Sequence, residues 1–174
     1  NLGEVVDALV ALIDDPECTI EELTQHIKGP DFPTGGFIMV RQGIRDAYTT
    51  GKGKVVMRAR AEIEEYKEGR FRILVTEIPY MVNKSRLVTN IADRVKEKRV
   101  EGISDLRDES GRDGMKIVME LKRDADPQVV LNQLYKHTSL QENFHINMLA
   151  LVDMEPRTLN LREMLDHYLH FQEQ

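Results

Sequence analysis

The chain changes its hydrophobic period within residues 43–60, and this change constrains two neighbouring elements of the fold. Before Gly51, apolar residues such as Ile44 and Tyr48 recur at helical spacing, whereas from Val55 onward they alternate with polar residues. The stretch therefore predicts a short helix and a long strand joined by a tight turn.

The predicted turn is Gly51-Lys52-Gly53. Because glycine has no Cβ, both glycines can adopt positive φ, and the backbone can approach a ligand while Lys52 and Lys54 project from it. The strand should run as far as Ile63, with one apolar side and one polar side that begins with Arg58 and Arg60. This clustering of cations suits a phosphate backbone, and it equally suits a solvated surface hairpin.

Charge is distributed unevenly along the chain. Residues 1–34 hold eight acids and one lysine, whereas residues 41–60 hold six bases and one acid. The formal net charge of -6 argues against a protein covered in nucleic acid. A local basic patch on an acidic protein instead favours contact with DNA phosphates at one place.

Composition indicates an ordinary globular protein. Hydrophobic residues make up 41% of the 174 residues and charged residues 31%, which suits one domain with a proper core. No apolar run is long enough to cross a bilayer, so we expect no membrane partner. The single cysteine, Cys18, and the lack of a signal-like start predict a cytoplasmic location.

Capping signals mark most of the expected helices. An apolar pattern at residues 3–14 is followed by a capping box at Thr19, and residues 83–99 carry a second long apolar stripe. Asp126 followed by proline, and Asn160 with a glutamate three residues later, begin two more helices.

The expected strands alternate with these helices. The apolar run at residues 37–40 predicts a buried strand, and Glu68-Gly69 predicts a two-residue turn into a strand at residues 70–78. Further strands are expected at residues 115–122 and 144–152.

Strand pairs separated by helices predict an α+β fold, with an antiparallel or mixed sheet and helices packed mainly on one face. N-terminal and C-terminal helices should lead to neighbouring domains. We expect a helical connector at residues 1–34, an α+β domain at 35–157 and the start of a further helix at 158–174.

Nucleotide and metal motifs fail on inspection. Asp46 stands where a phosphate loop needs its first glycine, and Val56 stands where a dinucleotide loop needs its third. In the acidic loop at residues 108–114, Arg112 occupies a calcium-ligand position. His167 and His170 lack the further converging ligands that a metal site requires. The sequence predicts no catalytic residue, cofactor site or metal site in this chain.

Five motifs, taken in order, resemble the family of bacterial DNA gyrase A, a type IIA topoisomerase. They are residues 44–60, TEIPYMVNK at 76–84, GISDLRDES at 102–110, LNQLYK at 131–136 and NMLALV at 147–152. The resemblance covers essentially the whole chain. It implies that residues 35–157 form the tower of the breakage-reunion domain and that residues 158–174 lead toward the coiled-coil exit gate. The corresponding A protein of topoisomerase IV is the nearest alternative.

The resemblance implies a parent enzyme that passes one duplex through a transient double-strand break in another and so supercoils DNA. Such an enzyme uses an active-site tyrosine, Mg²⁺, and ATP hydrolysed by a partner, gyrase B, in an A2B2 heterotetramer. The family's nucleophile follows an arginine, and none of the five tyrosines here does. We therefore expect the catalytic tyrosine upstream of Asn1, a chain inactive by itself, and a cytoplasmic, nucleoid-associated parent.

The implied task of this part of the parent is to hold the arms of the cleaved duplex. The candidate phosphate contacts are Arg45, Lys52, Lys54, Arg58, Arg60 and Lys84. Lys84 should be aided by the free N–H groups at the start of its own helix.

Two other functions stay open. The chain could be a purely structural connector whose basic turn meets another protein segment. An RNA-binding α+β domain is disfavoured, because aromatic residues make up only 6% of the chain and tryptophan is absent.

Overall fold

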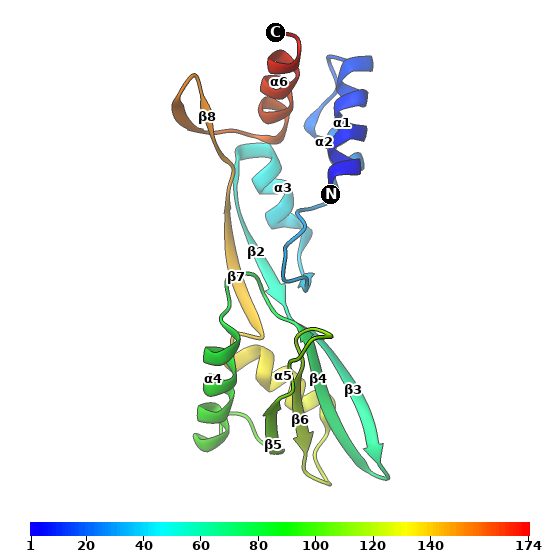
Figure 1. Ribbon diagram of the computed structural model, residues 1–174, viewed down its shortest axis with the longest axis vertical. Coiled ribbons are helices and arrows are strands. Elements are labelled where there is room, and N and C mark those ends of the chain that lie inside the picture. The colour runs from blue at the N-terminus through cyan, green and yellow to red at the C-terminus, as the bar shows by residue number, and fades with distance from the viewer. The chain divides into compact units, whose positions relative to one another are not determined.

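The computed structural model describes residues 1–174, which form six helices and nine strands (Figure 1). The chain divides into two compact units. Unit 1 consists of Asn1–Asp31, Val40–Val56 and Asn143–Gln174, and unit 2 of Phe32–Met39 and Met57–Glu142. Each unit is thus assembled from segments distant in sequence, whereas the expected segments 1–34, 35–157 and 158–174 follow one another along the chain. No helix combines the length and the apolar content that crossing a membrane requires.

Unit 1 contains four helices, α1 (Leu2–Asp14), α2 (Ile20–His26), α3 (Arg41–Thr50) and α6 (Leu161–Gln172). The expected capping boxes form at the starts of α2 and α6, on Thr19 and Asn160. The core between the helices is built from Ala8, Leu9, Leu12, Leu23, Tyr48, Leu161 and Leu165. Arg162 donates hydrogen bonds to the carbonyl oxygens of Pro16 and Cys18, so α6 is tied to the connection between α1 and α2.

Glycine allows α3 to lie directly on β2 (Lys52–Arg58). A Cβ built on Gly53 would stand only 2.2 Å from the carbonyl oxygen of Gly43 in α3. Gly51 ends α3 with φ of 86°, and its N–H donates to the carbonyl of Ala47. Gly53, expected in the turn, lies instead inside β2 and has no positive φ. Its function is close contact between helix and strand, which any side chain would prevent.

Besides the four-stranded sheet of unit 2, the chain forms two small sheets, in which β1 (Phe37–Ile38) is antiparallel to β2 and β8 (Leu149–Val152) is antiparallel to β9 (Glu155–Thr158). β1, β2 and β7 (Gln141–Asn147) form a three-stranded sheet in that order. The single strand predicted at residues 144–152 is divided between β7 and β8 at Met148, whose N–H donates to the Gly51 carbonyl and whose own carbonyl accepts from the N–H of Leu159.

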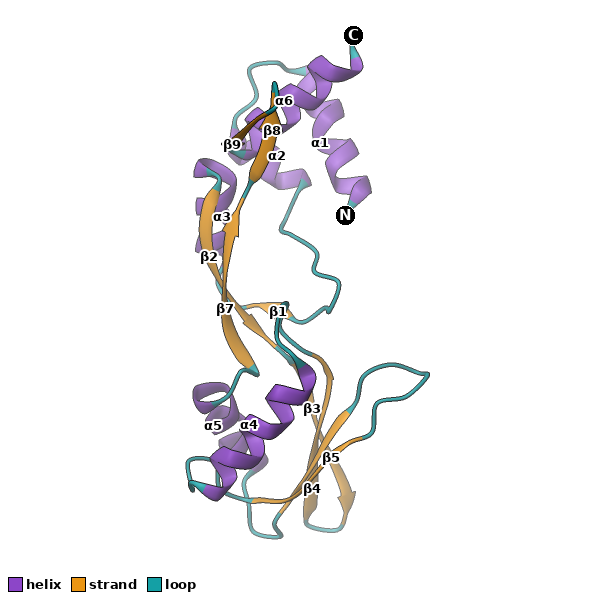
Figure 2. Cartoon of the chain, turned by 60° about the vertical axis from the view of Figure 1, so that its left-hand side comes forward, coloured by secondary structure: helices purple, strands orange, loops and turns teal.

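Unit 2 is a four-stranded sheet covered by two helices. β3 (Arg60–Lys67), β4 (Arg70–Glu77), β6 (Ile117–Leu121) and β5 (Ile103–Asp108) pair in the order β3-β4-β6-β5, antiparallel throughout. α4 (Lys84–Lys96) and α5 (Pro127–His137) lie on the same side of this sheet (Figure 2). The core between them includes Ile73, Leu87, Ile91, Ile117, Met119 and Leu134. Each such buried side chain contributes about 1.5–3 kcal/mol.

The predicted fold class is confirmed, but several strand limits were wrong. The strand expected through Ile63 breaks at Ala59, whose N–H donates to the carbonyl of Leu140 at 2.8 Å. The register then shifts between Arg60 and Ala61, and Ile63 is exposed. The alternation of apolar residues continues across this break, so the sequence pattern does not reveal it. β5 was not expected from the sequence.

The run at residues 37–40 is also not the buried strand that its composition predicts. Only Phe37 and Ile38 pair with β2, and the side chains of Phe37 and Met39 are 51% and 44% exposed. A two-residue strand cannot cover both of its faces. Val40 is the N-cap of α3 and has φ of −133°, an extended conformation that valine adopts without strain.

Candidate nucleic-acid interface

The six cations predicted to contact phosphate are divided between the units. Arg45, Lys52 and Lys54 belong to unit 1, and Arg58, Arg60 and Lys84 belong to unit 2.

In unit 1, α3 and β2 present exposed cations that have no acidic partner. Lys52 and Lys54 are exposed on β2, while Val55 on the other side of the strand is fully buried. Residues two apart on a strand share a side and lie about 7 Å apart. Arg45 is exposed on α3, and no carboxylate lies within 4 Å of any of these three side chains.

The nearest acid in the sequence is already engaged. The Asp46 carboxylate accepts a hydrogen bond from the side-chain amide of Gln42 at 2.7 Å, one turn earlier on α3. The hydroxyl of Thr50 bonds both the N–H and the carbonyl of Lys52, which fixes the backbone at the start of β2. The cations of unit 1 therefore lie on a rigid support and remain available for phosphate.

In unit 2, Arg58 is held by two contacts. Its Nε donates to Oε1 of Gln141 at 2.6 Å, and its guanidinium lies 4.4 Å from the centre of the Tyr135 ring. Arg58, Tyr135, Phe37 and Met39 line one hollow of about 350 Å³. The arginine is therefore preorganised beside exposed apolar side chains. Sequence reasoning missed this apolar part, although four apolar residues after a Pro- and Gly-rich loop could have indicated an exposed tip.

Arg60 and Lys84 have acidic partners of their own. Arg60 lies 3.9 Å from Glu77 and 5.8 Å from the Phe37 ring centre. The ammonium of Lys84 lies 3.1 Å from the Asp108 carboxylate. Hydrogen bonds from Ser110, followed by the Lys84 contact, lower the pKa of Asp108 to about 2. Lys84 is thus a counter-charge in this structure, and the N–H of Arg86, one of the groups at the start of α4 that were expected to assist it, already donates to the Asn83 side chain.

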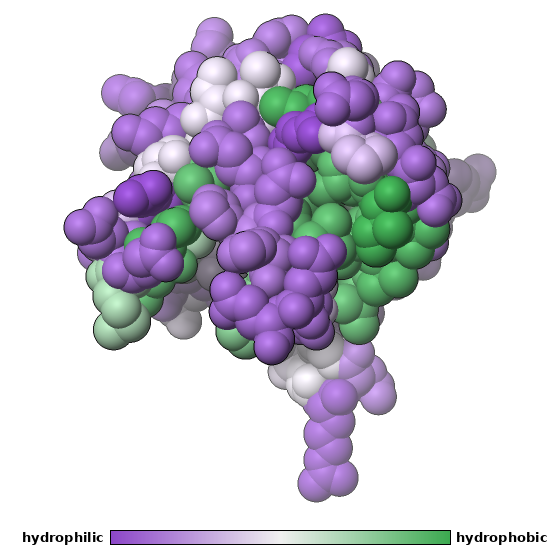
Figure 3. Space-filling model, turned by 90° about the horizontal axis from the view of Figure 1, so that it is seen from above, coloured by the Kyte–Doolittle hydropathy of each residue, from purple (hydrophilic) through white to green (hydrophobic).

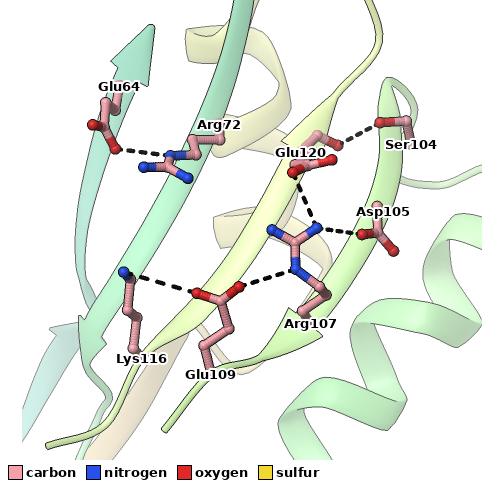
Figure 4. Close-up of polar contacts among 8 residues, drawn as sticks. All are labelled: Glu64, Arg72, Ser104, Asp105, Arg107, Glu109, Lys116 and Glu120. Carbon is pink, nitrogen blue, oxygen red and sulfur yellow. Dashed lines mark hydrogen bonds and ion pairs between the residues drawn. The ribbon is translucent and has the colours of Figure 1, made fainter. Parts of the chain in front are cut away.

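The sheet face of unit 2 that the helices leave open carries a network of ion pairs, drawn in Figure 4. Arg107 lies 2.5 Å from Asp105, 3.1 Å from Glu109 and 3.0 Å from Glu120. Arg72 pairs with Glu64, and Lys116 with Glu109. These residues are four acids and three bases, so their cations are matched by carboxylates and offer phosphate no excess positive charge. The Arg107 group connects β5 with β6 and the loop between them, and Arg72 with Glu64 forms a separate pair across β3 and β4. The sequence gives no sign of these contacts because they depend on strand order.

Unit 1 also has an apolar surface, which Figure 3 shows as a green area on the side where Figure 1 places α1. Exposed apolar side chains recur on α1 at Leu2, Val6, Val10 and Ile13, about one turn apart. A phosphate backbone gains nothing from such a surface, so it lies outside the candidate interface.

Comparison with known proteins agrees with the motifs. The family model described as the A subunit of DNA gyrase/topoisomerase IV matches residues 1–174. The chain is 63% identical to the DNA gyrase A of Clostridium acetobutylicum over its full length, which is 21% of that relative. It is 53% identical to the DNA gyrase A of Dehalogenimonas lykanthroporepellens, again over the full length of this chain, which covers 22% of that relative.

A third relative gives the same result. Over 99% of the chain, identity to the DNA gyrase A of Halalkalibacterium halodurans is 54%, and 20% of that relative is covered. The chain thus spans about a fifth of the length of these relatives. Because the family model matches every residue, this chain belongs to the family formed by the A proteins of DNA gyrase and topoisomerase IV.

Proposed function

We propose that this chain is the part of a type IIA DNA topoisomerase that holds the arms of the cleaved duplex, the tower of the breakage-reunion domain. The observation that carries the proposal is the set of unpaired cations on α3 and β2, namely Arg45, Lys52 and Lys54. Membership of the gyrase A family makes duplex DNA the natural source of phosphates.

The cations of unit 1 are proposed to contact the phosphate backbone without reading sequence. Lysine and arginine on a strand and a helix can follow a line of phosphates, and such contacts position a duplex rather than select it.

The exposed apolar side chains at β1 in unit 2, Phe37 and Met39, are proposed to add apolar contact with DNA. Phe37 and Met39 are exposed beside Arg58, and proteins that bend DNA commonly press apolar side chains against a base step while cations hold the flanking phosphates. Arg60 and Lys84 are weaker candidates, because each would first have to leave an acidic partner.

The activity proposed for the parent is ATP-dependent strand passage and supercoiling. It would act with gyrase B in an A2B2 heterotetramer, with Mg²⁺ and ATP used through that partner, in the cytoplasm at the nucleoid. We assign no residue of this chain to metal, nucleotide or covalent catalysis. No tyrosine here follows an arginine, so the chain alone is proposed to be inactive in DNA cleavage.

Salt dependence of DNA binding tests the interface. The variant Lys52→Gln/Lys54→Gln should reduce the slope of log affinity against log salt by about 1.8, because each lost phosphate contact removes about 0.9. The matched control is Lys67→Gln/Lys136→Gln, which removes two exposed lysines outside the interface and should leave the slope unchanged.

Two outcomes would favour other functions. Equal slopes for the Lys52/Lys54 variant and the unaltered chain would point to a structural connector. A slope that falls on single-stranded RNA but not on duplex DNA would point to an RNA-binding domain.

A further inference from the structure

A second group of cations lines a large hollow in unit 2, where the end of α4, the start of β5 and the connection from β6 to α5 meet. The hollow has a volume of about 730 Å³, and its cationic side chains are Lys96, Lys98, Lys122 and Arg123. All four are exposed. The candidate interface described above contains none of them.

These four side chains are uncommitted, in contrast to most of the cations around them. Arg94 and Arg99 on either side of the group both pair with Glu97. No carboxylate lies within 4 Å of the ammonium or guanidinium groups of the four, and they donate no hydrogen bond.

The hollow also has acidic residues, which limit what it can bind. Glu101, Asp124 and Asp126 line it, and Asp126 is engaged in capping α5 through the N–H of Gln128. The net field is therefore weak. A ligand would be held by individual contacts with spaced anionic groups rather than by bulk attraction.

The backbone at Lys98 is unusual for a residue with a side chain. Lys98 has φ of 57°, a left-handed conformation that a lysine rarely adopts. The N–H of Arg99 bonds the carbonyl of Arg94, and the N–H of Lys98 bonds that of Val95, which together form the helix ending that usually has glycine at this position. Glycine would adopt this conformation without strain, yet position 98 is a lysine, and that lysine lines the hollow.

Gly102 shapes the wall of the hollow. Gly102 has φ of 95°, and a Cβ there would stand 2.9 Å from the Cβ of Ala125. The N–H of Lys122 donates to the Gly102 carbonyl at 2.7 Å, which fixes the backbone that carries Lys122 and Arg123. Cations from α4 and from the β6–α5 connection are therefore held around one space.

We propose that this hollow is a second contact site for the phosphate backbone of duplex DNA, built from Lys96, Lys98, Lys122 and Arg123. The inference rests on the proposed function and extends it, since unit 2 would then carry phosphate contacts of its own, in addition to those proposed for unit 1. Phosphate oxyanions are the chemistry that recognises these groups, and DNA is the source to which we commit.

The decisive variant is Lys98→Gly in the full chain. Glycine relieves the left-handed backbone, so Tm should stay the same or rise by about 2–4 °C. Affinity for a long duplex should nevertheless fall, and the salt slope should drop by about 0.9. A binding loss that accompanies unchanged or higher stability cannot come from misfolding. Lys98→Arg should retain binding, and Lys122→Gln/Arg123→Gln should lower the slope by about 1.8.

The controls separate this inference from the proposed function. If Lys52→Gln/Lys54→Gln lowers the slope and the hollow variants do not, this second site is overturned and the first stands. If only the hollow variants lower it, the second site stands and the first fails. Binding of inorganic phosphate in the hollow with no change in duplex affinity would overturn the assignment to DNA.

Discussion

The carbonyl oxygen of Lys54 lies so close to Gly43 that a Cβ at residue 43 would stand 1.9 Å from it. This contact sets the separation between α3, which carries Arg45, and β2, which carries Lys52 and Lys54. It is backbone against backbone, so neither side can yield by rotating a side chain.

Gly43→Ala should therefore destabilise the chain by about 2–3 kcal/mol, although alanine normally favours a helix over glycine. Thermal unfolding measures the loss. The control is Gly111→Ala, where a Cβ would meet nothing within 4 Å. A Gly43→Ala variant as stable as the control would mean that α3 can move away from β2 at little cost.

Asp108→Asn should remove a pH-dependent part of the stability. The folded pKa of Asp108 is lowered to about 2 by Ser110 and Lys84, so its contribution is present above the unfolded value, near 3.9, and is lost as pH falls through 2. The variant should be less stable than the unaltered chain at pH 5–7 and nearly equal to it by about pH 2. Unfolding curves across this range test it, and a difference of full size that persists at the acid end would contradict it.

Tyr48→Phe should change stability mainly at high pH. Burial, with smaller effects from Glu4 and Asp31, raises the pKa of Tyr48 to about 12. An unfolded phenol ionises near pH 10, so the stability due to Tyr48 is complete below 10 and is lost as pH rises through 12. Phenylalanine keeps the ring in the core and should flatten this decline. Urea unfolding between pH 9 and 12, with ultraviolet titration of the phenolate, provides the measurement.

Arg107→Gln should lower Tm most at low salt. The change leaves Asp105, Glu109 and Glu120 near one another without the guanidinium that joins them. Their repulsion is screened as ionic strength rises, so the deficit in Tm should shrink in concentrated salt. Arg112→Gln is the matched control, because Arg112 is exposed and has no ion pair. A deficit independent of salt would indicate lost packing instead.

Local signals predicted much of the fold. Thr19 and Asn160 begin helices because each cap needs only residues within one turn, and Glu68-Gly69 joins β3 to β4 for the same reason. The break at Ala59 and the pairing of β5 with β6 could not be predicted, since both depend on hydrogen bonds to segments far along the chain.

The candidate site was predictable in part. The cations of residues 41–60 could be found from the charge pattern alone. The sequence did not show which of them would be free and which would pair with an acid. Arg60 and Lys84 differ from Lys52 and Lys54 only in having Glu77 and Asp108 beside them, and those neighbours are set by tertiary structure. The exposed tip at Phe37 was missed because an apolar run is usually buried.

The division into units also bears on synthesis. Unit 2 ends at Glu142, whereas unit 1 needs Asn143–Gln174, including the Leu161 and Leu165 side chains that complete its core. During translation, unit 2 is therefore complete while α2 and α3 still lack α6, which packs against both of them. The core of unit 1 therefore stays open until the end of the chain has been made, and its apolar residues are accessible to chaperones during that time.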